Sequence, residues 1–123
     1  MRASRSTTTA PGPRPSPTPA WRCEADERGV TAFSPSGPAA QVTVHEVDAG
    51  VQLDFWVSDG VPHQVRSELT RRVFQHPALR PRRVVAAALP QRETEVLQEL
   101  RAHVVDEHTH VAGSTCLVEG RVR

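Results

Sequence analysis

Two histidines and a glutamate near the C-terminus have the residue types and spacing that could bind a metal. His108 and His110 stand two residues apart in a segment that alternates as a β-strand does, so both side chains point to one face. If residues 113–114 form a two-residue hairpin turn, His110 pairs with Leu117 and His108 pairs with Glu119. Two imidazoles and a carboxylate on one face could hold zinc and leave a fourth position open. The alternative is a polar face on a hairpin at the sheet edge, and no HExxH or CxxC spacing supports the metal.

The same hairpin contains a small-residue turn that resembles a nucleophile loop. Residues 113–116 are Gly-Ser-Thr-Cys, which combine two hydroxyls and a thiol. The segment does not match G-x-S-x-G, and the sequence pairs no base with it. Cysteine is among the residue types that are most often buried. We therefore expect Cys116 to be a buried strand residue beside Val111 rather than a nucleophile.

Arginine supplies every long cationic side chain, because the chain has no lysine; it also has no isoleucine, asparagine or tyrosine. These four residue types have AT-rich codons, so the composition indicates a GC-rich, bacterial genome. Between residues 66 and 92 seven arginines accompany a single acid. The candidates for binding a phosphate or an acidic partner are Arg71, Arg72, Arg80, Arg82 and Arg83. The alternative is a solvated helix face that is balanced by acids on the following helix.

Residues 41–57 predict a β-hairpin with an exposed apolar patch. A three-residue loop over 48–50, with glycine in the left-handed conformation, pairs Val47 with Val51. This register leaves three apolar side chains on the face opposite the main apolar face of the second strand: Val42, Val44 and Trp56. Residues 21–33, a second subunit or another protein would cover them.

Two helices and a further strand follow this hairpin. Apolar residues recur at helical spacing over residues 61–76 and 93–105. The apolar run at residues 84–89 predicts a strand that is buried on both faces. With a hairpin over 109–118 the order becomes β-β-α-β-α-β-β. This order predicts an α+β two-layer sandwich, a mixed sheet of four to six strands with two helices on one face.

The N-terminal residues differ in composition from the rest. Residues 1–20 are rich in Pro, Ser and Thr, with proline at every second position from 11 to 19, and their charges are Arg2, Arg5 and Arg14. Because the segment has nothing apolar to bury, we expect a disordered, solvated tail that serves as a spacer or a docking arm. We expect residues 21–40 to be a partly ordered linker or short hairpin, and residues 41–123 to be the α+β domain.

Charge, cysteine content and hydropathy limit the classes of function. Residues 21–123 carry twelve arginines against fourteen acids, a net charge of −2, so we do not expect nucleic acid as a partner. Two cysteines are too few for a disulfide scaffold. No apolar run approaches the roughly 20 residues of a membrane span, so we expect no membrane partner. These features predict a cytoplasmic protein with reduced thiols.

No group of residues in the sequence specifies an activity. The chain lacks the glycine-rich phosphate loop of nucleotide-binding folds, and it lacks the Arg/Gln-x-x-Gly-x-Gly/Ala loop of small acetyltransferases. We expect a small non-catalytic protein without a cofactor, which binds itself as a homodimer or another protein through the patch at Trp56. A second hypothesis is a zinc-binding protein or small enzyme that uses His108, His110 and Glu119. A third is a phosphate or nucleic-acid binder that uses the arginines between Arg71 and Arg83.

Overall fold

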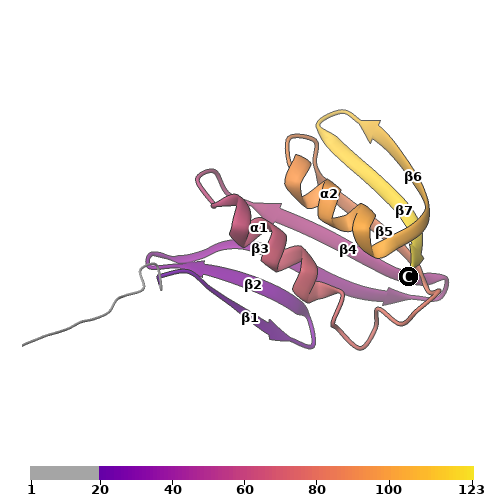
Figure 1. Cartoon of the computed structure of the whole chain (residues 1–123), viewed down its shortest axis with the longest axis horizontal. Helices are drawn as coiled ribbons and strands as arrows, with labels where there is room; N and C mark the ends of the chain where they lie inside the picture. Colours follow the sequence, from indigo (N-terminus) through magenta and orange to yellow (C-terminus); the bar gives the residue numbers. More distant parts are fainter. Residues whose placement is uncertain (1–19) are drawn as a thin grey trace, which may run out of the picture.

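A computed structural model describes residues 20–123, which form one mixed sheet of seven strands with two helices (Figure 1). The strands are β1 (Arg22–Asp26), β2 (Gly29–Ser34), β3 (Gly37–Val47), β4 (Gly50–Val57), β5 (Val84–Pro90), β6 (Val104–Ala112) and β7 (Thr115–Val122). The helices are α1 (His63–Val73) and α2 (Thr94–His103). The α+β class is confirmed, although the sheet has more strands than expected. Of the tail predicted for residues 1–20, residues 1–19 lie outside the described residues.

The order of the strands in the sheet is β1-β2-β3-β4-β5-β7-β6. All neighbours are antiparallel except β4 and β5, which are parallel and are connected through α1. Residues 21–40 contribute β1, β2 and the beginning of β3, and the first hairpin turns between Asp26 and Gly29. The sheet therefore continues without a break across residue 40.

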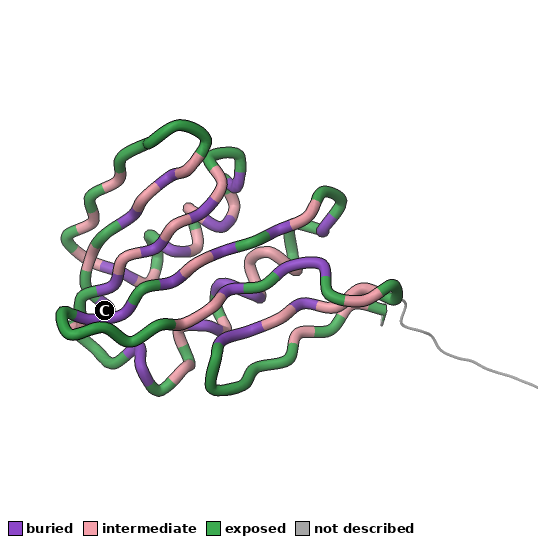
Figure 2. Tube along the Cα trace, turned by 180° about the vertical axis from the view of Figure 1, so that it is seen from behind, coloured by how far each residue is buried: buried purple, intermediate pink, exposed green. Residues whose placement is uncertain are grey.

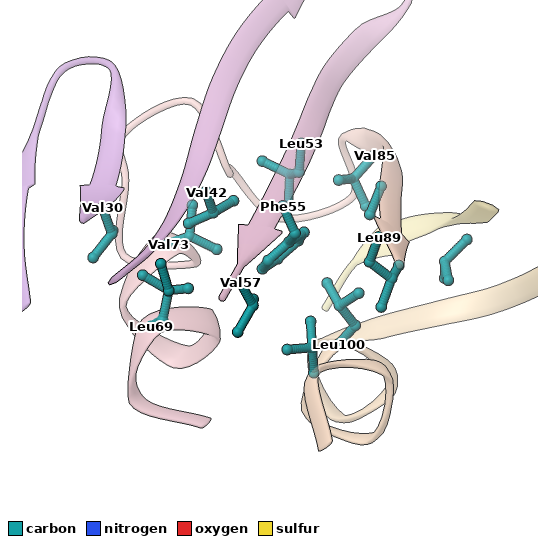
Figure 3. Packing of buried hydrophobic residues seen from close by; sticks show 14 of the residues in the cluster. Val30, Val42, Leu53, Phe55, Val57, Leu69, Val73, Val85, Leu89 and Leu100 are labelled. Carbon is teal, nitrogen blue, oxygen red and sulfur yellow. The ribbon is translucent and has the colours of Figure 1, made fainter. Parts of the chain in front are cut away.

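Both helices cover the same face of the sheet, and the hydrophobic core lies between the two layers. On β4 the buried side chains Val51, Leu53, Phe55 and Val57 alternate with side chains that are exposed or half-buried, as period-two burial of one strand face requires. The helices contribute buried apolar residues to this core: Leu69, Val73, Val96 and Leu100 (Figure 3). We call the opposite, helix-free side the outer face (Figure 2).

The prediction that β5 is buried on both faces was wrong. Val85, Ala87 and Leu89 are buried beneath the helices, but Val84 on the outer face is 43% exposed. The run is apolar on both sides because Ala86 and Ala88 occupy the outer face, where they are half-buried without a helix above them.

The predicted register of the β3–β4 hairpin was wrong by one residue. Gly50 belongs to β4 and pairs with Val47, so the turn holds two residues instead of three. Gly50 has a φ of 155°, and a Cβ there would lie 2.2 Å from the carbonyl oxygen of Val84, which explains why glycine stands at this point. Because a shift of one residue exchanges the strand faces, the partners of Leu53 and Phe55 are Val44 and Val42.

The predicted register of the β6–β7 hairpin is confirmed. His110 pairs with Leu117 and His108 with Glu119 around a turn at residues 113–114. Strand β6 is longer than expected because it begins at Val104, directly after α2, and a bulge between Val105 and His108 follows. Neither helix in residues 20–123 is long and apolar enough to cross a membrane.

Candidate binding cleft at the diverging strands

A cleft opens in the sheet where the two parallel strands stop pairing. Strands β4 and β5 pair only over Val51–Asp54 and Val85–Ala88, and their carboxyl-terminal residues diverge (Figure 1). The resulting cavity has a volume of about 340 Å³ and is lined by Asp54, Phe55, Ala88, Leu89, Pro90, Arg92, Ser114 and Thr115. Crevices at the carboxyl ends of parallel strands are common ligand sites, because the loops that follow the strands meet there.

Different elements supply the polar groups of this cleft. Asp54 lies on the outer face of β4, and Arg92 is the second residue after β5. Ser114 belongs to the β6–β7 turn, which is held beside the end of β5 by a 2.8 Å hydrogen bond from the Gln91 amide to the Ser114 carbonyl. Asp54 also lies 3.5 Å from His45 Nε2, and both side chains are about half exposed. The cleft thus offers a carboxylate, a guanidinium and two hydroxyls, with the second hydroxyl from Thr115.

Glu93, the residue after Arg92, forms a buried ion pair with Arg66. Glu93 is 2% exposed, and its Oε1 lies 3.0 Å from Nε of Arg66 on α1. The angle is not that of a hydrogen bond, and neither atom has another hydrogen-bond partner within residues 20–123. Burial raises the pKa of the Glu93 carboxyl above its usual value, and the charges of Arg66 and Arg92 oppose that rise. Arg92 is 62% exposed and contacts Glu93 at 3.7 Å and Asp59 at 3.6 Å, so its guanidinium stays accessible to a ligand.

Trp56 lies beside the cleft on the outer face. It is the outward-facing residue of β4 that follows Asp54, its cross-strand neighbour is Gln41, and it is 52% exposed. The structure does not bring Val42 and Val44 to this position. Val42 is fully buried in the core and Val44 packs against the core, because the true register places both under the helices. The apolar patch predicted from these three residues is therefore reduced to Trp56.

The structure does bring His108, His110 and Glu119 to one exposed surface of the β6–β7 hairpin. A cavity of about 260 Å³ lies there, and its lining includes His108, Glu119 and Arg121 but not His110. Within residues 20–123 no group of three or more His, Cys, Asp and Glu side chains is arranged to hold a metal ion.

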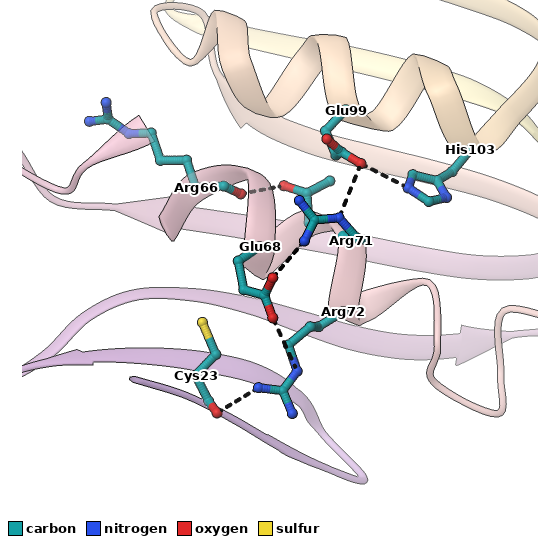
Figure 4. A network of polar contacts seen from close by, with 8 residues as sticks. Cys23, Arg66, Glu68, Arg71, Arg72, Glu99 and His103 are labelled. Carbon is teal, nitrogen blue, oxygen red and sulfur yellow. Dashed lines mark hydrogen bonds and ion pairs between the residues drawn. The ribbon is translucent and has the colours of Figure 1, made fainter. Parts of the chain in front are cut away.

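The five arginine candidates do not act as one free cationic surface. Arg71 pairs with Glu68 of the same helix at 2.6 Å and lies 3.9 Å from Glu99 of α2. Arg72 donates to the Cys23 carbonyl at 2.8 Å, so both arginines connect α1 to its neighbours (Figure 4). Arg83 donates to Glu46 at 2.9 Å and to the carbonyl of Ala78 at 3.3 Å. The remaining two, Arg80 and Arg82, are exposed, and no ion pair is seen for either within the described chain.

The two cysteines have different environments and are not joined. Cys116 is 4% exposed and pairs with Val111, as expected from the sequence. Cys23 is half-buried on the helix side of β1, and its burial, followed by the nearby charge of Glu68, raises the pKa of its thiol. Neither thiol has the features of an activated nucleophile.

The cleft was not among the sites predicted from the sequence. Its signal was present, because a strand, a helix and a second strand in succession predict parallel neighbours whose carboxyl ends meet at one edge. Asp59 and Arg92 are each the second residue after one of those two ends in the sequence. How far the two strands pair before they separate is a matter of tertiary structure, which no local sequence pattern encodes.

Comparisons with known proteins do not assign the chain to a family. No protein-family model and no curated protein matches it. Among solved structures, one described as a "putative acetyltransferase" from Sphaerobacter thermophilus is 14% identical, with a TM-score of 0.49 over 85% of this chain and 71% of that chain. These values are too low to transfer an activity, a ligand or a residue role to this chain.

Proposed function

We propose that this protein acts without catalysis, by binding another protein through the outer face of its sheet around Trp56. The observation on which the proposal rests is the 52% exposure of Trp56 on a sheet face that no helix of the described chain covers. Tryptophan is enriched at protein interfaces and among the residues that dominate their binding energy.

The neighbouring cleft supports the same proposal. Interfaces gain most of their affinity where a side chain of one protein fills a pocket of the other, next to aromatic anchors. The cavity of about 340 Å³ is large enough for one side chain of a partner, and Asp54 and Arg92 at its walls could pair with charges of either sign. The two unpaired cysteines are in keeping with the expected cytoplasmic location.

A photo-crosslinking experiment in cells tests this proposal. A photoreactive residue in place of Gln41, the cross-strand neighbour of Trp56, should give a discrete covalent adduct with the partner. The same residue in place of Asp48, in the β3–β4 turn, is the control and should give none. Equal adducts from both positions, or none from Gln41, would contradict the proposal.

The identified partner then allows a quantitative comparison. We expect Trp56→Ala to weaken binding by at least roughly tenfold, as for other tryptophan anchors. Val47→Ala, which removes a comparably exposed apolar side chain at the far end of the same hairpin, should change the affinity less than about twofold.

A small-molecule ligand is a second candidate, and the cleft itself favours it. Its volume lies at the lower end of the range for ligand pockets, and apolar walls from Phe55 and Leu89 accompany a few polar groups. Native mass spectrometry of the gently purified protein should then show a bound mass that is absent from an Arg92→Ala variant. Zinc binding has less support, since no metal-holding group is found in residues 20–123. Phosphate or nucleic-acid binding also has less support, since three of the five candidate arginines are engaged.

A further inference from the structure

Strand β6 forms one edge of the sheet. It stands at the end of the strand order opposite β1, and among residues 20–123 it pairs with β7 alone (Figure 1). A strand at a sheet edge presents backbone amides and carbonyls that can serve as a template for another strand. The hydrogen bonds of β7 show which backbone groups of β6 are free.

The backbone groups of β7 alternate between its two neighbouring strands, as they do in any antiparallel ladder. The Gln91 amide, directly after β5, donates to the Ser114 carbonyl at 2.8 Å. At the other end of β7 the Val122 amide donates to the Arg83 carbonyl, directly before β5, at 2.9 Å. The even-numbered residues from 114 to 122 therefore direct their backbone groups toward β5, and the odd-numbered residues direct theirs toward β6.

This alternation determines which residues of β6 face outward. The odd-numbered residues of β7 pair with three even-numbered residues of β6: His108, His110 and Ala112. Thr109 and Val111 lie between these residues, so their amides and carbonyls point away from the sheet. None of the hydrogen bonds within residues 20–123 uses these groups. Residues 108–112 thus present a regular ladder edge with free donors and free acceptors.

The other edge segments of the sheet carry features that oppose pairing. On β1 the outward carbonyl of Cys23 already accepts a 2.8 Å hydrogen bond from Arg72. The first half of β6 is interrupted by a bulge between Val105 and His108, and Asp106 within it has a φ of 55°. Bulges and side chains that cover an edge are devices by which natural sheets avoid pairing with other chains.

The second half of β6 has none of these features. Residues 108–112 follow one register with β7, and they include no proline, aspartate, glutamate or arginine. Val111, on the helix side of this segment, is 55% exposed. An edge strand without charge, proline or bulge is the kind that natural sheets leave open where a partner strand covers it.

We propose that two copies of the chain pair antiparallel through residues 108–112 of β6 and thereby join their sheets. A second copy fits this edge because it presents the same donors and acceptors at the same spacing, and a two-fold axis matches them reciprocally. The segments meet without repulsion between like charges, since neither contains an acid or an arginine. A two-fold axis perpendicular to the sheet leaves the helices of both copies on one face.

The free backbone groups select one register. Outward-facing residues must lie opposite each other, so Thr109 pairs with Val111 of the second copy around an axis at His110. A register shifted by two residues in one direction would use Gly113, whose φ of 65° is not extended. The opposite shift would use Glu107, which lies within the bulge. In the proposed register every outward amide and carbonyl of Thr109 and Val111 is paired.

The inference goes beyond the proposed function, because it concerns the sheet edge and does not involve Trp56. Pairing through five residues a side buries less surface than the roughly 1,200 Å² of stable complexes. We therefore expect a reversible dimer with a dissociation constant of roughly 10–100 µM.

Sedimentation of the full chain over a concentration series measures this dimer. Val111→Lys should weaken it at least roughly tenfold, because a lysine on an edge strand opposes pairing and here would place two ammonium groups near the axis. The matched control is Val47→Lys, which changes a 47% exposed valine in the same way but away from the edge, and which should alter the dissociation constant less than about twofold.

Cysteine crosslinking tests the register with a gain of signal. The two copies of residue 110 would form a non-hydrogen-bonded pair with their Cα atoms about 4.5 Å apart, which is within the range for a disulfide. His110→Cys should therefore give a covalent dimer under mild oxidation. Ala112→Cys, an equally exposed position on the same strand, lies opposite His108 of the second copy and should not. The natural chain, with Cys23 and Cys116, gives the background.

Four results would overturn the proposal. The natural chain could remain monomeric at roughly 0.5 mM, well above the expected dissociation constant. Val111→Lys could dimerise as tightly as the natural chain. The two cysteine variants could crosslink equally or not at all. A dimer that is lost in Trp56→Ala but kept in Val111→Lys would assign the contact to the outer face, so failure of this proposal is distinguishable from failure of the proposed function.

Discussion

Replacement of Arg66 by leucine should show how strongly the buried ion pair stabilises the molecule. Arg66 is 19% exposed and lies 3.0 Å from Glu93, which is 2% exposed. Without Arg66 the buried carboxylate keeps only Arg92, whose Nε is 3.7 Å away and whose side chain is 62% exposed. Removing one partner of a buried pair costs about 3–5 kcal/mol. We expect about 3 kcal/mol at neutral pH, because Arg66 retains some solvent contact and the pair lacks hydrogen-bond geometry.

The destabilisation caused by Arg66→Leu should depend on pH, and the pKa of Glu93 determines in which direction. Burial raises the pKa of Glu93 in the folded protein above its unfolded value. Between the unfolded and the folded pKa the native state binds more protons, so the stability that this group contributes decreases as the pH rises through that window. Arg66 lowers the folded pKa, so Arg66→Leu should widen the window. The substitution should lower the free energy of unfolding only slightly below the unfolded pKa, where Glu93 is protonated in both states. The loss should reach its full value above the folded pKa, where Glu93 is ionised in both states.

Urea denaturation followed by circular dichroism from pH 4 to pH 8 measures this cost. The control is Arg71→Leu on the same helix, where Arg71 is 49% exposed and its pair with Glu68 should contribute less than about 1 kcal/mol. A cost for Arg66→Leu that is the same at both ends of the pH range would refute the reasoning, as would a cost no larger than that of the control.

Three further predictions test the register, the turn and the thiols. Val42→Ala should lower the free energy of unfolding by about 2 kcal/mol because Val42 is fully buried, whereas Trp56→Ala should cost less than about 1 kcal/mol; if the predicted three-residue loop were correct, chemical denaturation would show a cost for Val42→Ala as small as that for Trp56→Ala. Gly50→Ala should destabilise the protein by several kcal/mol more than Gly113→Ala, because an added Cβ at Gly50 collides with β5 and one at Gly113 meets open space; thermal unfolding measures both. Alkylation of Cys23 at pH 7 should be slower than that of a free thiol and should accelerate as the pH rises toward its raised pKa, and a rate independent of pH would contradict this.

The two hairpins show what the sequence could and could not predict. At residues 113–114 a glycine in the left-handed conformation sits inside a two-residue turn, so the turn alone determined the correct register of β6 and β7. Gly50 is a glycine because its backbone lies in close contact with β5, not because the turn needs one. The local sequence does not show that contact, so the prediction placed Gly50 in the loop. The apolar pattern held the missing information, since only the true register places Val42 and Val44 on the same face as Leu53 and Phe55.

The candidate site was less accessible to sequence reasoning than the fold. Individual polar residues could be identified, and the β6–β7 register placed His108 beside Glu119 correctly. The cleft requires Asp54, Arg92 and Ser114 from three distant segments to meet. Their meeting depends on the strand order β4-β5-β7, which the sequence does not specify. The pairing of arginines with acids on other elements depends on the same order.

The single parallel contact between β4 and β5 has a consequence for how the chain folds. The β1–β4 meander and the β6–β7 hairpin join residues that are close in sequence. The parallel pairing of β4 with β5, which we call the seam, joins residues 51–54 to residues 85–88, and the whole of α1 lies between them in the sequence. Contacts between distant residues require the larger loop-closure entropy, so we expect the seam to form late, after the hairpins on both sides. Interactions that are absent from the transition state affect mainly the unfolding rate. The Arg66–Glu93 pair connects α1 to the start of α2 across this seam. We therefore expect this pair to slow unfolding and to leave the folding rate unchanged.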